Sequence, residues 1–166
     1  MRMERTLVLI KPDGVVRHLV GRIITRFEDA GLKIVGMKMV WAEKVRAEQH
    51  YKEEIAEKHG EEVRSRLIDY LTSGPVIAFV LEGVDAVSVV RKMVGSTYPN
   101  QALPGTIRGD FAHVSKEFAN KNKINVKNLI HASESVEEAQ REIDIWFNPD
   151  ELHTYKTSHE MICFDE

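Results

Sequence analysis

The sequence predicts an α/β sandwich in which helices cover a sheet. Apolar runs of strand length lie at residues 6–10, 34–41, 76–81 and 126–130. Stretches with helical spacing of apolar residues separate them, and Gly, Pro and Asn mark the junctions. With 166 residues, of which 43% are hydrophobic, the chain can bury about 70% of its unfolded surface. We therefore expect residues 1–166 to form one compact domain.

The first predicted strand, residues 6–10, ends at the turn sequence K-P-D-G of residues 11–14. A helix is expected from Val20, because apolar residues then recur at helical spacing, and Gly31 offers a stop. The next strand is expected at residues 34–41, where alternate positions are apolar. The helical face comprises Val20, Ile23, Ile24 and Phe27, and the alternating positions are Val35, Met37, Met39 and Trp41.

Residues 43–72 are rich in Glu, Lys, Ala and Arg and predict two helices, broken at His59 and Gly60. The strand at 76–81 is expected to end at Gly83 and to be followed by a helix. That helix has its apolar stripe at Ala86, Val89, Val90 and Met93. Residues 95–110 lack periodicity and predict a long loop that contains Arg108. Long ordered loops in compact domains are usually functional.

Residues 112–127 are polar and predict a surface excursion. The strand at 126–130 then leads directly to His131. Ser135, with Glu138 three residues later, predicts the capping box of a helix that Asn148 and Pro149 end. The buried stripe of this helix is expected to comprise Val136, Ala139, Ile143 and Trp146.

Composition excludes several classes of protein. A net charge of -3 and a pI near 6.2 argue against nucleic-acid binding driven by overall charge. The single cysteine, Cys163, excludes a disulfide framework and a Cys-based zinc site and suits a reducing compartment. No apolar run approaches the roughly 20 residues of a membrane span. We expect a cytoplasmic protein without a membrane partner.

Three cations stand at structural discontinuities: Lys11 at a strand end, Arg91 near a helix end and Arg108 in the long loop. Each alone is typical of a surface charge, and spacing does not show that they converge. The chain contains neither the G-x-x-x-x-G-K-[ST] phosphate loop nor a G-x-G-x-x-G dinucleotide motif. Any phosphate site must therefore use other groups.

His131 is the histidine whose position in the sequence suggests a catalytic role. A neutral imidazole, with a reference pKa near 6.5, can attack an electrophilic phosphorus without prior deprotonation. Glu142 borders the buried stripe of the following helix, so its carboxylate needs a partner. Either it orients the His131 imidazole or it pairs with a basic surface side chain. His50 and His59 lack the spacing of a metal-binding pair and are interpreted as surface or packing residues.

Three stretches resemble the signature motifs of the nucleoside diphosphate kinase family. They are I-K-P-D-G-V at 10–15, P-G-T-I-R-G-D at 104–110 and N-L-I-H-A-S-E-S-V at 128–136. Shorter matches are H-Y at 50–51, S-G-P-V at 73–76 and R-K-M-V-G-S-T at 91–97. The resemblance extends over residues 6–155 and implies a ferredoxin-like fold with a four-stranded antiparallel sheet covered by helices.

The resemblance also implies a ping-pong reaction. The γ-phosphate of a nucleoside triphosphate, typically ATP, would pass through a phosphohistidine at His131 to a nucleoside diphosphate. Glu142 would orient His131, and Mg²⁺ would arrive with the nucleotide, so no protein metal ligand is expected. The phosphates and sugar would be surrounded by Lys11, Tyr51, Arg91, Thr97, Arg108 and Asn128. Family members are usually hexamers and less often tetramers, so we expect a homo-oligomer and favour the hexamer.

The chain departs from the family pattern where the nucleobase should bind. Val63 occupies the position of the usual stacking phenylalanine, Leu67 would line the other side, and Asn125 replaces a small residue. Ala132 and Glu134 stand where glycine and aspartate are common, and the polar insertion at 112–127 adds about ten residues.

Two other classes of function remain: a nucleotide-binding regulatory protein without turnover, and a nucleic-acid-binding module that uses the lysines of residues 116–127. The few aromatics there argue against the module.

Overall fold

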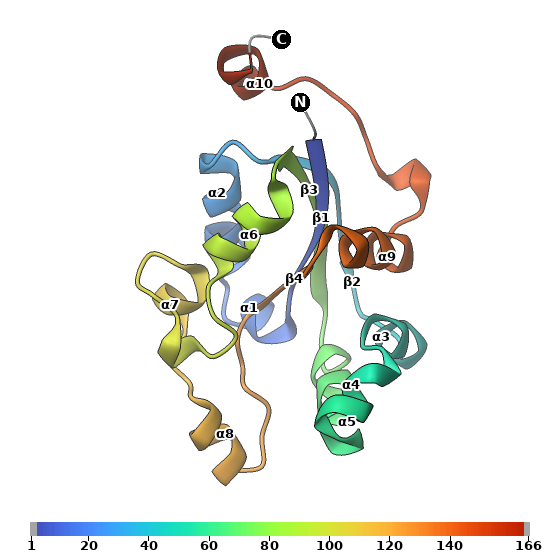
Figure 1. Ribbon diagram of the computed structural model, residues 1–166, viewed down its shortest axis with the longest axis vertical. Coiled ribbons are helices and arrows are strands. Elements are labelled where there is room, and N and C mark those ends of the chain that lie inside the picture. The colour runs from blue at the N-terminus through green and yellow to red at the C-terminus, as the bar shows by residue number, and fades with distance from the viewer. Residues whose placement is uncertain (1–2, 165–166) are drawn as a thin grey trace.

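The computed structural model describes residues 3–164, which form a four-stranded antiparallel sheet with helices on both faces (Figure 1). The strand order is β2-β3-β1-β4, so β1 and β3 are central and β2 and β4 are edges. The strands are β1 (Met3–Ile10), β2 (Lys33–Val40), β3 (Val76–Val84) and β4 (Ile130–Ala132). This confirms the predicted sandwich and the antiparallel sheet.

Alternate residues of β1 define two hydrophobic cores, because successive side chains of a strand point to opposite faces. Val8 and Ile10 pack on one face with α2 and α6, and Leu7 and Leu9 pack on the other with α3, α5 and α9 (Figure 1). All four are fully buried. The helices are α2 (Val20–Asp29), α3 (Lys44–His50), α5 (Glu61–Leu71), α6 (Ala86–Val94) and α9 (Val136–Trp146).

The helical predictions need two corrections. Residues 43–72 contain three helices, since the chain also breaks at Tyr51 and Lys52 between α3 and α4. Arg108 lies in a short helix, α7, because the Thr106 hydroxyl accepts a hydrogen bond from the Gly109 amide and caps it. The shorter elements are α1 (Pro12–Val16), α4 (Glu53–His59), η1 (Pro99–Gln101), α7 (Ile107–Phe111), α8 (Lys116–Lys121), η2 (Pro149–Glu151) and α10 (Ser158–Cys163).

All four strands differ from the prediction in their bounds: β1 begins three residues earlier and β2 lies one residue earlier, while β3 and β4 differ for reasons that the backbone shows. β3 continues through Gly83, which pairs with Glu4 of β1, so this glycine does not end the strand. β4 begins only at Ile130, because Leu129 has a φ of 71° that interrupts an extended backbone. His131 therefore lies within β4, opposite Leu9 of β1, and does not follow a strand.

Of the alternating apolar residues predicted for the second strand, only Val35 is buried in a core. The register of β2 against β3 shifts between Ile34 and Gly36, so Met37 and Met39 lie outward and Trp41, just beyond the strand, is also exposed. The segment after η2 crosses this edge, where the His153 amide donates to the Val35 carbonyl at 2.7 Å. An apolar strip remains uncovered on the sheet edge.

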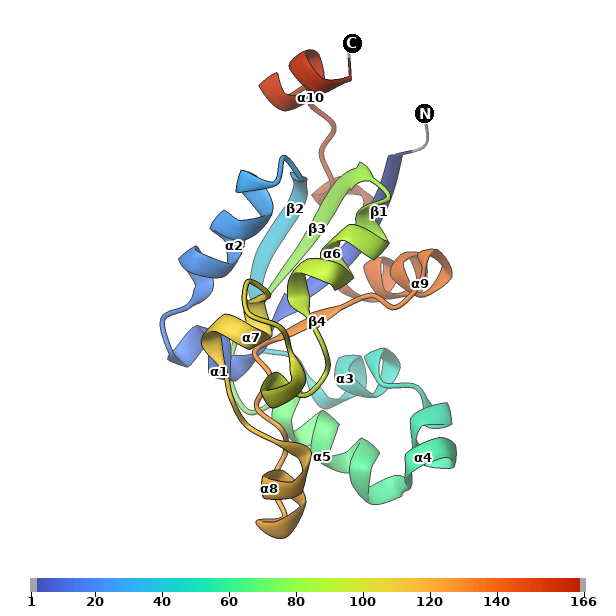
Figure 2. The ribbon, with the colours of Figure 1, turned by 60° about the vertical axis from the view of Figure 1, so that its left-hand side comes forward.

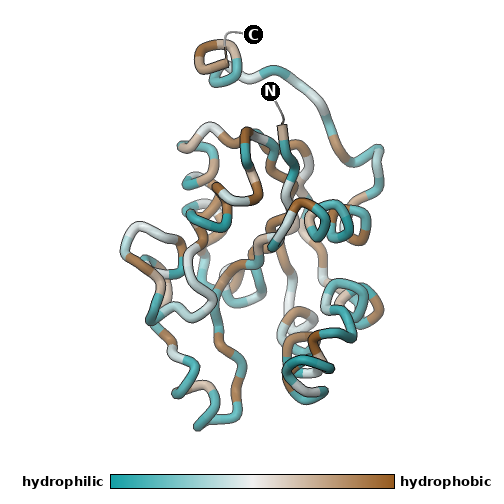
Figure 3. The backbone as a smooth tube through the Cα atoms, viewed as in Figure 1, coloured by the Kyte–Doolittle hydropathy of each residue, from teal (hydrophilic) through white to brown (hydrophobic). Residues whose placement is uncertain are grey.

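The polar insertion is more ordered than a surface excursion. It contains α8, whose N-terminus is capped by Ser115 and whose Ala119 is buried. Hydrophilic residues predominate along its backbone trace, and α8 lies toward the same end of the molecule as α5 (Figures 2 and 3). Among residues 3–164, no helix combines the length and the apolar content needed to cross a membrane.

Candidate active site

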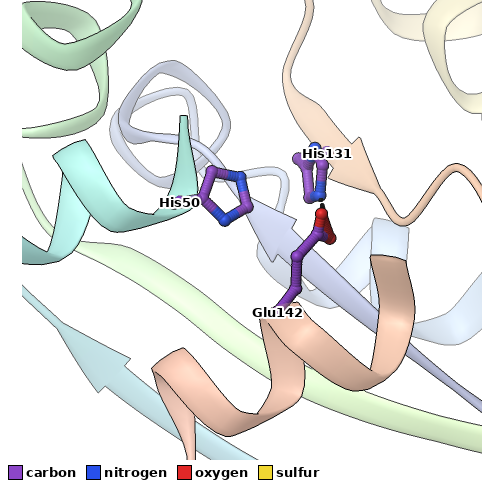
Figure 4. Close-up of side chains that lie close together, drawn as sticks. All are labelled: His50, His131 and Glu142. Carbon is purple, nitrogen blue, oxygen red and sulfur yellow. Dashed lines mark hydrogen bonds and ion pairs between the residues drawn. The ribbon is translucent and has the colours of Figure 1, made fainter. Parts of the chain in front are cut away.

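β4 and α9 bring His131 and Glu142 into direct contact. The Nε2 atom of His131 lies 2.7 Å from Oε1 of Glu142, and the His131 side chain is 21% exposed (Figure 4). An ionised carboxylate can only accept a hydrogen bond, so Nε2 carries the proton that it donates. The lone pair of a neutral His131 is then on Nδ1, which is the geometry that a nucleophilic imidazole needs.

Glu142 is buried and held by more than one donor. The Ser133 hydroxyl donates to the same Oε1 at 2.8 Å, and the Arg141 guanidinium lies 3.9 Å from Oε2. Burial alone would raise the pKa of Glu142, but the charge and hydrogen bond of His131, together with His50 and Ser133, bring it to about 2. Of the two partners that the sequence allowed, the oriented imidazole is therefore the principal one.

Sequence reasoning missed Ser133, although a signal was present. A strand period of two places residue 133 on the same side as His131. Its hydroxyl also accepts from the Leu7 amide at 3.2 Å, which ties the carboxylate network to β1. The predicted helix start at Ser135 is confirmed, since its hydroxyl accepts from the Glu138 amide. The predicted capping box is only half formed, because the Glu138 carboxylate binds Lys52 and Arg141 instead.

A cavity of about 290 Å³, here called the inner cavity, opens beside His131. It contains the three predicted cations, which come from the end of β1, from α6 and from α7. Their convergence was not derivable from spacing, and the fold supplies it. The inner cavity is lined by Lys11, Tyr51, Leu67, Arg91, Val94, Gly95, Thr97, Arg108, Asn128, His131, Ala132 and Glu134.

Lys11 is the most buried of these cations, at 6% exposure. Pro12 opens α1 and turns the chain immediately after β1, and the Lys11 amide donates to the Leu129 carbonyl at 2.8 Å. Its Nζ donates to Oδ1 of Asn128 at 2.8 Å. Burial, and then the charge of Arg108, lower the pKa of Lys11 to about 7.

Arg108 is held by backbone carbonyls. Its guanidinium donates to Asn128 at 3.2 Å, to Gly95 at 3.1 Å and to Ile130 at 2.5 Å. Burial and the charge of Arg91 lower its pKa to about 10, so the group remains charged at neutral pH. Gly95 has a φ of 89° and faces the Thr106 side chain, so only glycine fits this close approach.

Tyr51 presents a hydroxyl to the inner cavity. Within the described part of the chain this oxygen is buried and has no hydrogen-bond partner. Burial and the nearby Glu142 raise its pKa, so the hydroxyl stays protonated and can donate. An unpaired buried donor is costly unless a ligand satisfies it. Thr97 lies across the inner cavity, with its carbonyl held by the Asn128 amide at 3.0 Å.

A second cavity of about 500 Å³, here called the outer cavity, adjoins the first and shares Lys11, Leu67, Thr97 and Asn128 with it. Val63, 39% exposed, lines it. So does Asn125, whose amide donates to the Arg66 carbonyl at 2.8 Å. The insertion contributes Lys116, Ala119, Asn120, Ile124, Asn125 and Val126 to its wall. Sequence reasoning did not place α8 at the site, because no local pattern reports a long-range contact.

His50, interpreted as a surface or packing residue, is buried beside His131, whereas His59 is exposed. His50, His131 and Glu142 offer donor atoms within 4.8 Å of one another, the one such group found among residues 3–164. The potential ligand atoms already have hydrogen-bond partners, since His131 binds Glu142 and His50 Nδ1 accepts from Trp146. We therefore assign no metal to this group.

Comparisons with known proteins agree with this geometry. A family model for nucleoside diphosphate kinase matches residues 4–152. The nucleoside diphosphate kinase of Pyrococcus furiosus is 51% identical over 153 residues, covering 92% of this chain and 88% of the relative. That of Archaeoglobus fulgidus is 47% identical over 165 residues and 99% of both chains.

Solved structures are similar as well. A transition state mimic of nucleoside-diphosphate kinase from Borrelia burgdorferi, with bound vanadate and ADP, has a TM-score of 0.93 and 43% identity over 95% of both chains. A Halobacterium salinarum nucleoside diphosphate kinase in complex with CDP has a TM-score of 0.82 and 40% identity, covering 96% of this chain and 97% of that one. This chain belongs to the nucleoside diphosphate kinase family.

Proposed function

We propose that this member of the family moves the γ-phosphoryl group of a nucleoside triphosphate, typically ATP, to a nucleoside diphosphate through Nδ1 of His131. The observation that carries the proposal is the His131–Glu142 contact of 2.7 Å beside a cavity that holds three cations. The same contact argues against a regulatory protein without turnover, since it is the arrangement that a nucleophilic imidazole requires.

In the first half-reaction the Nδ1 lone pair forms a bond to the γ-phosphorus. The bond from that phosphorus to the β–γ bridging oxygen breaks, and the nucleoside diphosphate leaves with those electrons. The imidazole then carries a positive charge, which the Glu142 carboxylate offsets through Nε2. A different diphosphate attacks the phosphohistidine in the second half-reaction and restores the neutral imidazole. Lys11, Arg91 and Arg108 would stabilise charge on the equatorial oxygens.

We expect the two adjoining cavities to hold one nucleotide between them. Its phosphates and sugar would occupy the inner cavity, where Thr97, Asn128 and the Tyr51 hydroxyl can donate or accept hydrogen bonds. The base would enter the outer cavity between Val63 and Leu67, with Asn125 at its wall. Because most polar contacts go to phosphates and sugar, we expect broad base selectivity. A several-hundredfold preference between purine and pyrimidine diphosphates would contradict this expectation.

Mg²⁺ would enter as part of the substrate, coordinated by the nucleotide phosphates. Cations dominate the inner cavity, and Glu134 is the one carboxylate among its described lining residues. We therefore expect no protein cage of carboxylates for the ion, since magnesium usually needs few protein ligands when phosphates supply oxygens.

We also propose that residues 1–166 act as one domain in a cytoplasmic homo-oligomer, with a hexamer favoured and a tetramer possible. The uncovered edge of β2 supports self-association, because Met37, Met39 and Trp41 are each more than half exposed there. Size-exclusion chromatography with light scattering would measure the subunit number.

The central test is covalent labelling with γ-³²P-ATP followed by acid and base treatment. The unaltered chain should form an acid-labile, base-stable phosphoprotein that transfers its label to added GDP. His131→Ala should neither label nor turn over, and His113→Ala, which changes an exposed histidine, should do both normally. Persistent acid-labile label in His131→Ala would overturn the assignment.

A further inference from the structure

We propose that His50 is a positioning residue for the phosphoryl carrier: anchored by Trp146, its ring packs against the His131 ring and keeps Nδ1 of His131 turned toward the inner cavity. The inference rests on the proposed role of His131. It concerns a residue that lies outside the inner cavity and has no assigned part in binding nucleotide.

The contact between the two imidazoles is close. His50 ends α3 and is 3% exposed, and its ring centroid lies 4.4 Å from that of His131 with an interplanar angle of 80° (Figure 4). The single hydrogen bond to Glu142 fixes one ring nitrogen of His131 but leaves the ring able to swing about that point. A second ring packed against it at right angles restricts this swing.

Trp146 fixes His50 in turn. The indole Nε1–H donates to Nδ1 of His50 at 3.1 Å, and the two rings meet edge to face with centroids 5.7 Å apart. An indole nitrogen can only donate, so His50 Nδ1 must be an unprotonated acceptor. Protonating His50 would require this hydrogen bond to break. Trp146 therefore holds His50 in its neutral form as well as in place.

A neutral His50 matters because phosphoryl transfer places a positive charge on the His131 ring. A charged imidazole 4.4 Å away would oppose that step, whereas a neutral aromatic ring accommodates it. Burial, followed by His131, holds the pKa of His50 well below its ordinary value. The charged groups facing His50 shift its pKa in opposite directions. Glu142 favours its protonation, while Arg141 and Lys11 oppose it.

The other side chains described next to His50 do not offer it an opposite charge. Tyr51 packs edge to face against the His50 ring at 4.8 Å, with its hydroxyl protonated. Arg46, on the same helix as His50, lies over the Trp146 ring at 5.5 Å. Arg141 donates to the His50 backbone carbonyl at 3.1 Å, which anchors the end of α3 to α9. Contacts from β4 and α9, together with the adjacent Tyr51, thus fix the position of His50.

Three variants separate ring packing from hydrogen bonding. His50→Phe keeps a ring against His131 but removes the acceptor, His50→Asn keeps an acceptor but removes the ring, and Trp146→Phe removes the donor. Each is compared with the unaltered chain for the single-turnover rate of His131 phosphorylation by ATP, measured by rapid quench between pH 5.5 and 8.5. ADP affinity, from calorimetry, reports the nucleotide site separately.

We expect His50→Asn to slow phosphorylation at least tenfold at pH 7.5 while the ADP affinity changes less than twofold. His50→Phe should stay within about threefold of the normal rate. In Trp146→Phe the indole donor that requires an unprotonated Nδ1 is gone, so the pKa of His50 should rise although burial still lowers it, and the rate relative to the unaltered chain should fall as the pH drops from 7.5 to 5.5. Adding His50→Phe to Trp146→Phe should remove that fall.

A normal rate in His50→Asn, or parallel pH profiles for Trp146→Phe and the unaltered chain, would overturn the positioning role. If His50→Asn does not fold, the pH comparison of the two Trp146→Phe chains decides the question alone. Failure of the proposed function would look different, because the unaltered chain itself would then form no phosphohistidine.

Discussion

At pH 8, nucleotide binding should draw close to one proton from solvent onto Lys11. In the free chain, burial and the neighbouring Arg108 lower the pKa of Lys11 to about 7, so most molecules hold a neutral amine at this pH. A nucleotide phosphate placed beside Nζ favours the charged form and raises that pKa again. The lysine must then take up a proton as the phosphate binds.

The magnitude follows from the two pKa values. With a pKa of about 7, roughly one tenth of the Lys11 side chains are charged at pH 8, and a bound value near the reference of about 10.4 makes nearly all of them charged. Uptake is therefore about 0.9 proton per site. By linkage, nucleotide affinity should fall almost tenfold per pH unit between about pH 8 and pH 9.

Calorimetric titration of ADP at pH 8 in two buffers of different ionisation enthalpy measures the uptake directly. The ADP phosphates are fully ionised at this pH, so they contribute little. Lys11→Met should bind weakly and without proton uptake, whereas Lys92→Gln, at an exposed position on α6, should behave as the unaltered chain. Equal heats in both buffers for the unaltered chain would refute the reasoning, because Lys11 would then be charged before the nucleotide arrives.

Three further substitutions test other parts of the site. Glu142→Gln keeps an oxygen that accepts from the imidazole but removes the negative charge of the carboxylate. The hydrogen bond should weaken by about 1.4 kcal/mol, so phosphorylation of His131 measured by rapid quench should slow about tenfold while the ADP affinity stays unchanged. Gly95→Ala forces a side chain into positive φ against Thr106 and should lower the unfolding free energy in urea by about 1–3 kcal/mol. Val63→Phe should tighten ADP binding at least fivefold by stacking worth about 1–3 kcal/mol, and exposed Val45→Phe should not.

Much of the framework was predictable because its signals are local. The turn K-P-D-G after β1 places Lys11 at a strand end, and the spacing of α6 and α9 predicts which faces are buried. Motif resemblance then indicated His131 and its neighbours before their geometry was known. Apolar periodicity failed at β2, because a register shift turned Met37 and Met39 outward, and only pairing with β3 reveals such a shift.

The unpredicted features depend on contacts between distant segments. His50 and His131 are 81 positions apart, and the pairing exists only because α3 and β4 meet at α9. Likewise, polar residues of the insertion gave no sign that α8 would face α5 across the outer cavity. A strand or helix pattern shows which side of an element is buried, but it does not show which partner buries it.

The hydrogen-bond partners of the cations explain why the inner cavity fits phosphate. Within residues 3–164, neither Lys11, Arg91 nor Arg108 forms an ion pair; their nitrogens donate to backbone carbonyls and to the Asn128 amide oxygen. These neutral acceptors fix the side chains without cancelling their charge, and burial, followed by repulsion from Arg108, lowers the pKa of Lys11. A bound triphosphate supplies the missing counter-charge. Replacing Asn128 with Asp would neutralise Lys11 internally, so the same arrangement that positions the cations would then oppose the nucleotide.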